Sequence, residues 1–100
     1  MKIVAVTACP TGIAHTYMAA EQLERAAKKL GHQIKVETQG AMGIENELEQ
    51  SDIDGADVAI IASDIALERP ERFAQIRKVE VPVQAAIKNP DEVLEKISRF

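Results

Sequence analysis

A chain of 100 residues is long enough to bury a hydrophobic core without disulfides or metal ions, and we expect a single domain over residues 1–100. Hydrophobic residues make up 46% of the chain and charged residues 28%, which is typical of a globular protein and excludes a disordered one. The net charge of −4 and the 3% of aromatic residues argue against a nucleic-acid partner, which needs basic and aromatic side chains on the protein.

Cys9 is the one cysteine of the sequence, so it has no partner for an internal disulfide, and we expect a reduced thiol in a cytoplasmic protein. The longest uninterrupted apolar run, residues 58–62, is far shorter than the roughly 20 residues of a membrane span. Any association with a membrane is therefore expected to pass through a partner protein. No group of histidine, cysteine and carboxylate residues has the spacing of a metal site, and no cofactor is expected.

The first predicted elements in chain order are a strand, a helix and a second strand. Residues 3–6 form a short apolar run, which is typical of a strand buried on both faces of a parallel sheet. Apolar residues then recur at helical spacing over residues 15–30, and Gly31 supplies the stop at the C-terminal end of that helix. Over residues 34–38 charged side chains, including Glu37, alternate with uncharged ones, which predicts a strand with one wetter face near a sheet edge.

Shorter elements follow in the middle of the chain. Residues 43–48 have the pattern of a short helix with Ile44 and Leu48 directed inward, and residues 51–55 that of a further turn. A third strand is expected over residues 57–62. The carboxylates before this strand are expected to form an exposed acidic face: Glu45, Glu47, Glu49 and Asp52.

The last third of the chain predicts one more strand between two helical segments. A helical segment is expected over residues 69–74, because proline is tolerated in a first helical turn. Valines alternate over residues 79–83 as a fourth strand, and Pro82 places this strand at an edge because proline cannot donate to a ladder. Asn89 is expected to cap the final helix.

Strands that alternate with helices predict an α/β fold, here a small four-stranded, mainly parallel sheet with helices on both faces, Rossmann-like or flavodoxin-like. Ligands bind to such sheets at the carboxyl ends of the strands, where the strand order reverses. Three segments of this chain fall at such ends: Cys9, Gln39 with Gly40, and Ser63 with Asp64. We therefore expect Gln39, Gly40 and Asp64 to be possible pocket residues beside Cys9.

Cys9 stands directly before the first predicted helix, where the positive end of the helix dipole favours a thiolate. Unpaired N–H groups at such a helix start can close around a tetrahedral anion, and the hydroxyls of Thr11 and Thr16 and the imidazole of His15 add side-chain donors. Pro10 is expected to fix the exit from the strand. The predicted phosphate-binding residues are Pro10, Thr11, Gly12, Ile13, Ala14, His15 and Thr16.

The residues alone leave a structural alternative open. Cys9 could pack as a small buried hydrophobic residue, with the threonines serving only to cap the helix, which is the commoner fate of a lone cysteine. His15 could also be a polar first-turn residue that faces water, although its position in the loop favours the functional role.

The segment CPTGIAHT at residues 9–16 resembles the active-site segment of Enzyme IIB domains from the fructose branch of the bacterial phosphoenolpyruvate-dependent sugar phosphotransferase system. The resemblance continues through KVETQG at residues 35–40 and GIENEL at residues 43–48, and it covers nearly the whole chain. It implies that Cys9 accepts a phosphoryl group from a phosphohistidine of the IIA component. It further implies that Cys9 passes this group to fructose or a fructose-like sugar held by the membrane-embedded IIC component. The chain would be a transferase with a phosphocysteine intermediate, cytoplasmic and peripheral to the inner membrane through IIC.

Two other classes compete with this carrier. A low-molecular-weight phosphatase or arsenate-reductase-like enzyme places an arginine six residues after its cysteine as a bidentate phosphate clamp, whereas His15 occupies that place here. A softer clamp, with no acid positioned to activate water, suits a carrier that must not lose its phosphoryl group to hydrolysis. The second competitor is a redox-sensing or scaffolding module, in which Cys9 is never phosphorylated.

Overall fold

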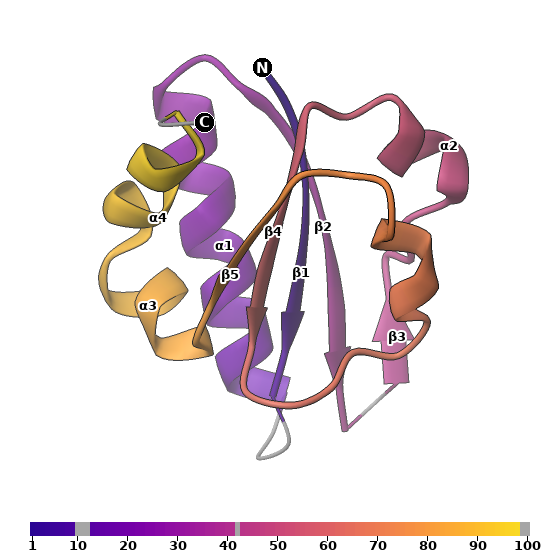
Figure 1. Cartoon of the computed structure of the whole chain (residues 1–100). Coiled ribbons are helices and arrows are strands. Elements are labelled where there is room, and N and C mark those ends of the chain that lie inside the picture. The colour runs from indigo at the N-terminus through magenta and orange to yellow at the C-terminus, as the bar shows by residue number, and fades with distance from the viewer. Residues whose placement is uncertain (10–12, 42, 99–100) are drawn as a thin grey trace.

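Five strands form one sheet in the computed structural model, which describes residues 1–9, 13–41 and 43–98 (Figure 1). The strands, in the order in which they lie across the sheet, are β3 (Gly43–Glu45), β2 (Gln33–Gly40), β1 (Lys2–Ala8), β4 (Val58–Ser63) and β5 (Lys78–Val81). The helices are α1 (Ile13–Lys29), α2 (Gln50–Asp54), α3 (Val83–Lys88) and α4 (Pro90–Ile97), with a 3₁₀ turn, η1 (Pro70–Phe73).

The sheet is parallel except at one edge. The central strand β1 pairs in parallel with β2 and with β4, so that Thr7 lies between Thr38 and Ala62, and β4 pairs in parallel with β5. At the other edge β3 pairs antiparallel with β2. The predicted mainly parallel α/β fold is thus confirmed, with five strands where the sequence predicted four.

The additional strand is β3, and it corrects the helix expected over residues 43–48. Gly43 has a φ of +87°, which turns the chain back along β2, so that Ile44 pairs with Gln39 instead of entering a helix. The backbone groups of this segment are thereby satisfied by the edge of the sheet. Leu48 is buried, as the sequence predicted, although it follows a strand and not a helical turn.

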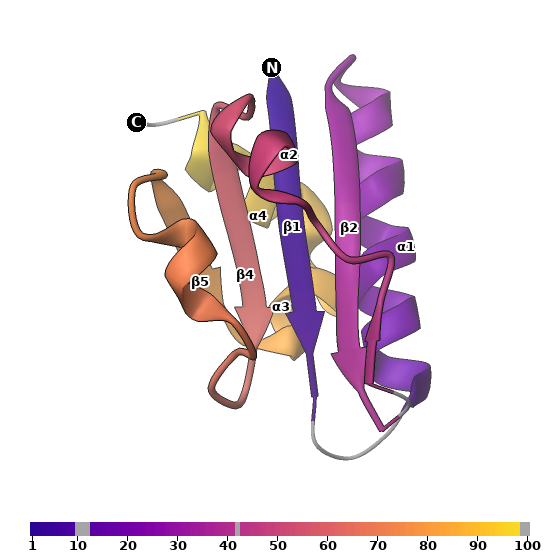
Figure 2. The same ribbon diagram turned by 90° about the vertical axis from the view of Figure 1, so that its right-hand side faces the viewer.

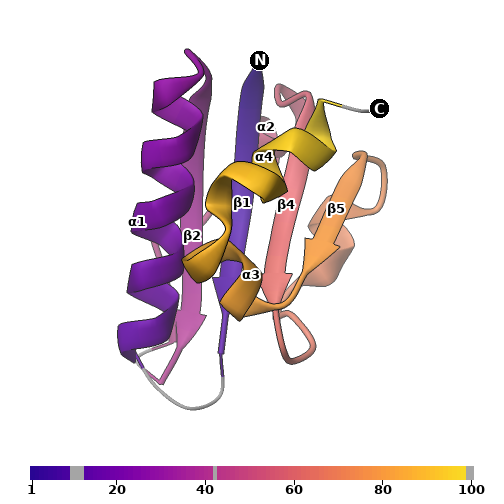
Figure 3. The ribbon, with the colours of Figure 1, turned by 90° about the vertical axis from the view of Figure 1, so that its left-hand side faces the viewer.

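Helices cover both faces of the sheet. Figures 1 and 3 show α1, α3 and α4 against one face, and Figure 2 shows α2 and the orange turn η1 against the other. Alternate residues of β1 enter separate hydrophobic clusters: Ile3 and Ala5 pack on the α1 side, and Val4 and Val6 on the α2 side. The apolar run at residues 3–6 therefore marks a strand buried on both faces, as expected.

The last predicted strand is shorter than expected. β5 ends at Val81, and Val83 begins α3, a helix that the alternating valines did not predict. Pro82 is the N-cap of α3, with extended backbone angles, and the carboxylate of Asp64 accepts the Val83 N–H at 3.2 Å. The expected edge position of this strand is confirmed, since β5 has β4 as its one neighbour in the sheet.

The ends of the helices agree better with the positions that the sequence predicted. Gly31 has a φ of +81° just beyond α1, as expected of a glycine that ends a helix. The turn expected over residues 51–55 is the short helix α2. Asn89 stands at the N-cap of α4, but its side chain makes no capping hydrogen bond. Within the described ranges no helix combines the length and the apolar character needed to cross a membrane.

Replacing Gly43 with alanine is expected to lower the free energy of unfolding by about 1 kcal/mol, because a Cβ strains the left-handed backbone that turns β2 into β3. Gly40→Ala is the matched control at the other end of this turn. A Cβ there would lie 3.5 Å from Thr16 Oγ1, an ordinary contact, so we expect a change within about 0.5 kcal/mol. Urea unfolding measures both variants, and equal losses would contradict this account of the turn.

Candidate active site at the carboxyl end of the sheet

Cys9 is the first residue after β1, at the point where the connections of the sheet change direction. After β1 the chain passes through α1 on one face to reach β2, whereas after β4 it passes through η1 on the opposite face to reach β5. The carboxyl ends of β1 and β4 therefore flank a topological switch point, the usual place for a ligand in an open α/β sheet.

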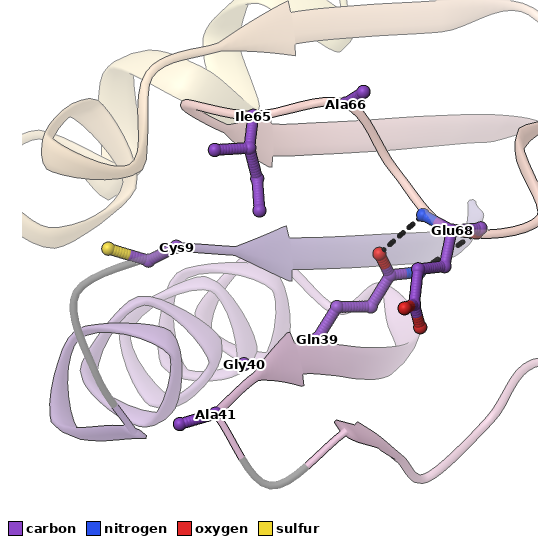
Figure 4. A pocket seen from close by; sticks show the side chains of 7 residues that line it. All are labelled: Cys9, Gln39, Gly40, Ala41, Ile65, Ala66 and Glu68. Carbon is purple, nitrogen blue, oxygen red and sulfur yellow. Dashed lines mark hydrogen bonds between the residues drawn. The ribbon is translucent and has the colours of Figure 1, made fainter.

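A cavity of about 160 Å³ lies at this carboxyl end of the sheet (Figure 4). Its lining residues are Cys9, Gln39, Gly40, Ala41, Ile65, Ala66 and Glu68. The structure thus brings Gln39 and Gly40 together with Cys9. Asp64 is not among the lining residues, because its carboxylate accepts the Val83 N–H at the start of α3.

The segment Ile65, Ala66 and Glu68, which we call the 65–68 wall, was not expected from the sequence. It follows β4 and belongs to no helix or strand. Ser63 Oγ accepts the Ile65 N–H at 3.1 Å where the chain leaves β4. The available signal was its position, since it begins at the carboxyl end of a strand next to β1.

Cys9 is nearly buried, with 4% of its surface exposed, and it belongs to the hydrophobic cluster on the α1 side of the sheet. Its N–H donates to the carbonyl of Gln39 at 3.3 Å, which continues the ladder between β1 and β2 by one residue. Its sulfur lies 3.9 Å from Nδ1 of the exposed His15, within the hydrogen-bonding range of sulfur. Cys9 therefore has the burial of a packing cysteine together with a polar, titratable neighbour at its sulfur.

The first turn of α1 is fixed to the sheet beside Cys9. Thr16 is 1% exposed, its carbonyl accepts the hydroxyl of Thr7 at 3.0 Å, and its side chain lies close to Gly40. Ala14 is exposed. Of the predicted phosphate-binding loop, Ile13 begins α1, whereas Pro10, Thr11 and Gly12 lie outside the described residues.

No arginine or lysine of the described residues lines the cavity. The buried Arg72 lies nearby, but all five of its N–H donors are engaged. It donates to both carboxylate oxygens of Glu37 and to the carbonyls of Leu48, Glu68 and Arg69. Arg72 is therefore a structural residue with no donor left for a phosphate.

The wetter face expected for the second strand is wrong at Glu37, which is 0% exposed. Its carboxylate accepts from both Arg72 Nη atoms at 2.7 and 3.0 Å, from the Gln39 amide at 2.7 Å and from the Leu48 N–H at 2.7 Å. Burial alone would raise the pKa of the Glu37 carboxyl, but these hydrogen bonds outweigh burial and hold the pKa below its usual value. Alternation in the sequence predicts that a charged residue of a strand is exposed. The prediction fails for Glu37 because its partner Arg72 lies 35 residues away along the chain.

The acidic face expected before β4 is partly right. Glu47 and Glu49 are exposed, whereas Glu45 and Asp52 are half-buried. Three of these carboxylates have specific partners: Glu45 accepts from the Tyr17 hydroxyl, Glu47 pairs with Arg69, and Asp52 pairs with Lys35. In the parts of the chain that the structure describes, no group of three or more histidine, cysteine and carboxylate residues could hold a metal ion.

Comparison with known families assigns the chain. Residues 4–96 match the family model described as "PTS system, Lactose/Cellobiose specific IIB subunit", where PTS denotes the phosphotransferase system. The chain belongs to the IIB family of this sugar phosphotransferase system. This membership confirms the resemblance seen in the sequence and makes the chain a component of sugar phosphotransfer.

Individual members of the IIB family are similar to the chain at high identity. The fructose-like EIIB component 2 of Escherichia coli (strain K12) is 53% identical over 96 residues, which are 96% of this chain and 91% of the relative. The fructose-specific EIIABC component of Bacillus subtilis (strain 168) is 53% identical over 95 residues, which are 95% of this chain but 15% of that larger protein. The IIB family thus includes proteins of about this length and segments of longer chains.

Solved structures of IIB proteins share the fold. The crystal structure of a predicted fructose-specific IIB from Escherichia coli has a TM-score of 0.94 and 44% identity, with 98% of this chain and 87% of that chain covered. A domain of the fructose-specific IIABC component from Borrelia burgdorferi has a TM-score of 0.91 and 47% identity, with 95% and 90% covered. The Rossmann-like or flavodoxin-like expectation is therefore confirmed.

Proposed function

We propose that Cys9 carries a phosphoryl group between two other components of the phosphotransferase system, and that residues 1–100 act as one IIB domain. In the first step the P–N bond of a phosphohistidine on the IIA component breaks as a P–S bond to Cys9 forms, and the histidine nitrogen that leaves takes up a proton. In the second step the P–S bond breaks as a sugar hydroxyl on the IIC component gives up its proton and forms a P–O bond. Cys9 returns to the thiolate, so both steps balance.

The observation that carries this proposal is the position of the Cys9 sulfur. It stands between the end of β1 and the start of α1, at the edge of a cavity, with the imidazole of His15 at 3.9 Å. The start of a 17-residue helix stabilises an anion, and a histidine beside the sulfur can donate to a phosphoryl oxygen. The same position explains how a cysteine with 4% of its surface exposed meets a donor, since the cavity opens beside it.

The geometry favours a carrier over a phosphatase. A cysteine phosphatase clamps its phosphate with an arginine and protonates its leaving group with an aspartic acid. Within the described residues no arginine lines the cavity, and Asp64 is bound to the Val83 N–H. A phosphoryl group on Cys9 would therefore wait for a partner's nucleophile without the arginine clamp and the aspartic acid of a phosphatase among the described residues.

Fructose or a fructose-like sugar is the proposed final acceptor, because the relatives at 53% identity carry fructose in their names. The partners are then a phosphorylated IIA protein or domain and a membrane IIC component that presents the sugar. IIA and IIC parts occur together with this segment in relatives named EIIABC and EIIBC. The proposal places the chain at the cytoplasmic face of the inner membrane, bound there by IIC.

The test is to mix the purified chain with a IIA protein phosphorylated on histidine and to follow its intact mass. We expect a gain of one phosphoryl group, which is lost again, with formation of a sugar phosphate, when IIC membranes and fructose are added. No gain in mass would favour the redox or scaffolding class. Steady hydrolysis of an aryl phosphate by the chain alone, lost in Cys9→Ser, would favour the phosphatase.

His15→Ala is expected to slow phosphoryl transfer from IIA by about 10- to 100-fold, because a charge-assisted hydrogen bond to the phosphoryl group is worth about 1.5–3 kcal/mol. The free energy of unfolding should change by less than about 0.5 kcal/mol, since His15 is exposed. His32→Ala is the matched control, because His32 lies beyond the opposite end of α1, beside the amino terminus, and its loss should leave transfer unchanged. Quenched-flow measurement of the transfer rate decides, and an unchanged rate in His15→Ala would count against its role.

A further inference from the structure

Two buried threonines lie side by side on the face of the sheet that α1 covers. Thr7 of β1 pairs in register with Thr38 of β2, and they follow Ala5 and Val36 of the hydrophobic cluster on the α1 side at a spacing of two residues. Side chains two residues apart in a strand point to the same face, so both threonine side chains lie on the α1 side. Thr7 is 0% exposed and Thr38 is 4% exposed, so bulk water reaches neither.

The two hydroxyls differ in their hydrogen bonds. The Thr7 hydroxyl donates to the carbonyl of Thr16 at 3.0 Å, and Thr16 is 1% exposed, so water does not compete for this bond. A carbonyl has two lone pairs, and that of Thr16 can accept this hydroxyl as well as the N–H of residue 20 within α1. The Thr38 hydroxyl has no hydrogen-bond partner among the described residues. Of the two neighbours, Thr7 is therefore the one whose hydroxyl ties the sheet to α1.

The bond between Thr7 and Thr16 joins the two ends of the segment that holds Cys9 and His15. Thr7 stands two residues before Cys9 in the chain, and Thr16 directly follows His15. The Cys9 sulfur and His15 Nδ1 are 3.9 Å apart, near the upper end of the hydrogen-bonding range of sulfur, so a small displacement of the first turn would separate them. The first turn of a helix frays readily, because its N–H groups have no partner within the helix. A bond that fastens Thr16 therefore sets the position of His15 at the sulfur.

We propose that Thr7 is a positioning residue, whose hydroxyl holds the first turn of α1 against β1 and thereby keeps the His15 imidazole beside the Cys9 sulfur. This inference rests on the proposed function of Cys9 as phosphoryl carrier. Thr7 is 0% exposed and its hydroxyl is engaged, so it acts through His15 and not by contact with the phosphoryl group. Neither Thr7 nor Thr16 lines the cavity beside Cys9, so their bond leaves the approach of a donor open.

Thr7→Val tests the proposal, because valine has nearly the same shape as threonine but no hydroxyl. We expect phosphoryl transfer from IIA to Cys9 to slow by about tenfold, the upper value for the loss of one neutral hydrogen bond. Thr38→Val is the matched control, since it makes the same change at the neighbouring buried position, where the hydroxyl has no partner among the described residues. Its transfer rate should lie within about twofold of the wild-type rate. Thr7→Ser, which keeps the hydroxyl, should recover most of the rate that Thr7→Val loses.

A double-mutant cycle separates the positioning of His15 from a general loss of structure. If Thr7 acts through His15, Thr7→Val should slow transfer by about tenfold in the wild-type background but by less than about twofold in the His15→Ala background. An equal slowing in both backgrounds would mean that Thr7 acts elsewhere, and it would overturn the inference. A wild-type rate of transfer in Thr7→Val would overturn it as well.

Amide hydrogen exchange tests the position of the first turn without any phosphoryl group. The N–H groups of residues 17–20 bond to the carbonyls of residues 13–16 in α1, so their exchange reports the opening of this turn. They should exchange about tenfold faster in Thr7→Val than in Thr38→Val, an opening worth about 1.4 kcal/mol. Equal exchange in the two variants would contradict the inference. A wild-type chain that accepts no phosphoryl group would overturn the proposed function instead, and the exchange rates would still decide whether Thr7 holds the first turn.

Discussion

Arg72→Met is expected to lower the free energy of unfolding by about 3–5 kcal/mol at neutral pH, the range seen when one partner of a buried ion pair is removed. The side chain of Arg72 is 4% exposed and that of Glu37 is 0% exposed, so the variant would leave a carboxylate buried without its cation. It would also leave the carbonyls of Leu48 and Glu68 without the guanidinium that they share. A loss of this size is a large part of the stability of a 100-residue domain.

The pH dependence of this loss identifies its cause. In the wild-type chain the pKa of Glu37 is lowered from 4.5, so its stabilising contribution is present above that pH and is lost as the pH falls through the lower folded value. In Arg72→Met the carboxylate loses its cation, burial then raises its pKa, and protonation relieves the penalty. The difference in stability between the two chains should therefore shrink as the pH is lowered from 7 towards about 4.

Urea unfolding at several pH values measures this difference, with Arg25→Met as the matched control. The Arg25–Glu21 pair is exposed, at 71% and 61% of the two side chains, and its loss should cost no more than about 1 kcal/mol. The double variant Glu37→Leu with Arg72→Met should recover part of the loss, because no charge then remains buried. Equal losses in Arg72→Met and Arg25→Met would contradict a dominant role for the buried pair.

Cys9→Ser is expected to abolish phosphoryl transfer from IIA to this chain. A serine hydroxyl stays protonated near neutral pH, and the described residues place no base beside it other than the exposed His15. The variant should remain folded, since one atom changes in a site that already contacts an imidazole. A hydroxyl in the hydrophobic cluster on the α1 side of the sheet should lower the free energy of unfolding by about 1 kcal/mol.

Transfer to this variant is measured by intact mass after incubation with phosphorylated IIA. Cys9→Ala serves as the control for packing, because it removes the reacting atom without adding a hydroxyl. Both variants should show no phosphoryl group at times when the wild-type chain is fully modified. A Cys9→Ala chain that is still phosphorylated would place the acceptor on another residue.

Much of the fold follows from local patterns in the sequence. The apolar run at residues 3–6 identified a strand buried on both faces, and Gly31 marked the end of α1, because period and backbone preference act over a few residues. The segment at residues 43–48 was misassigned, because its apolar residues have the spacing of a helix. An edge of the sheet, supplied by residues of β2, made the strand β3 the more stable choice.

The candidate site divides in the same way. Topology placed Gln39 and Gly40 at the carboxyl end of β2, and they do line a cavity with Cys9. The Glu37–Arg72 pair and the hydrogen bonds that join the 65–68 wall to Gln39 could not be predicted, because they link residues 35 and 29 positions apart. Asp64 stands at a strand end as predicted, yet its carboxylate binds the start of α3, a helix that the pattern of valines concealed.

The most direct measurement is to identify the atom that carries the phosphoryl group, by phosphorus NMR and peptide mapping of the chain after reaction with phosphorylated IIA. The account predicts a single phosphorus bound to sulfur, in the peptide that contains Cys9, which is released by oxidation of the sulfur. A phosphorus bound to an imidazole nitrogen, on His15 or His32, or a chain that gains no phosphorus, would contradict it.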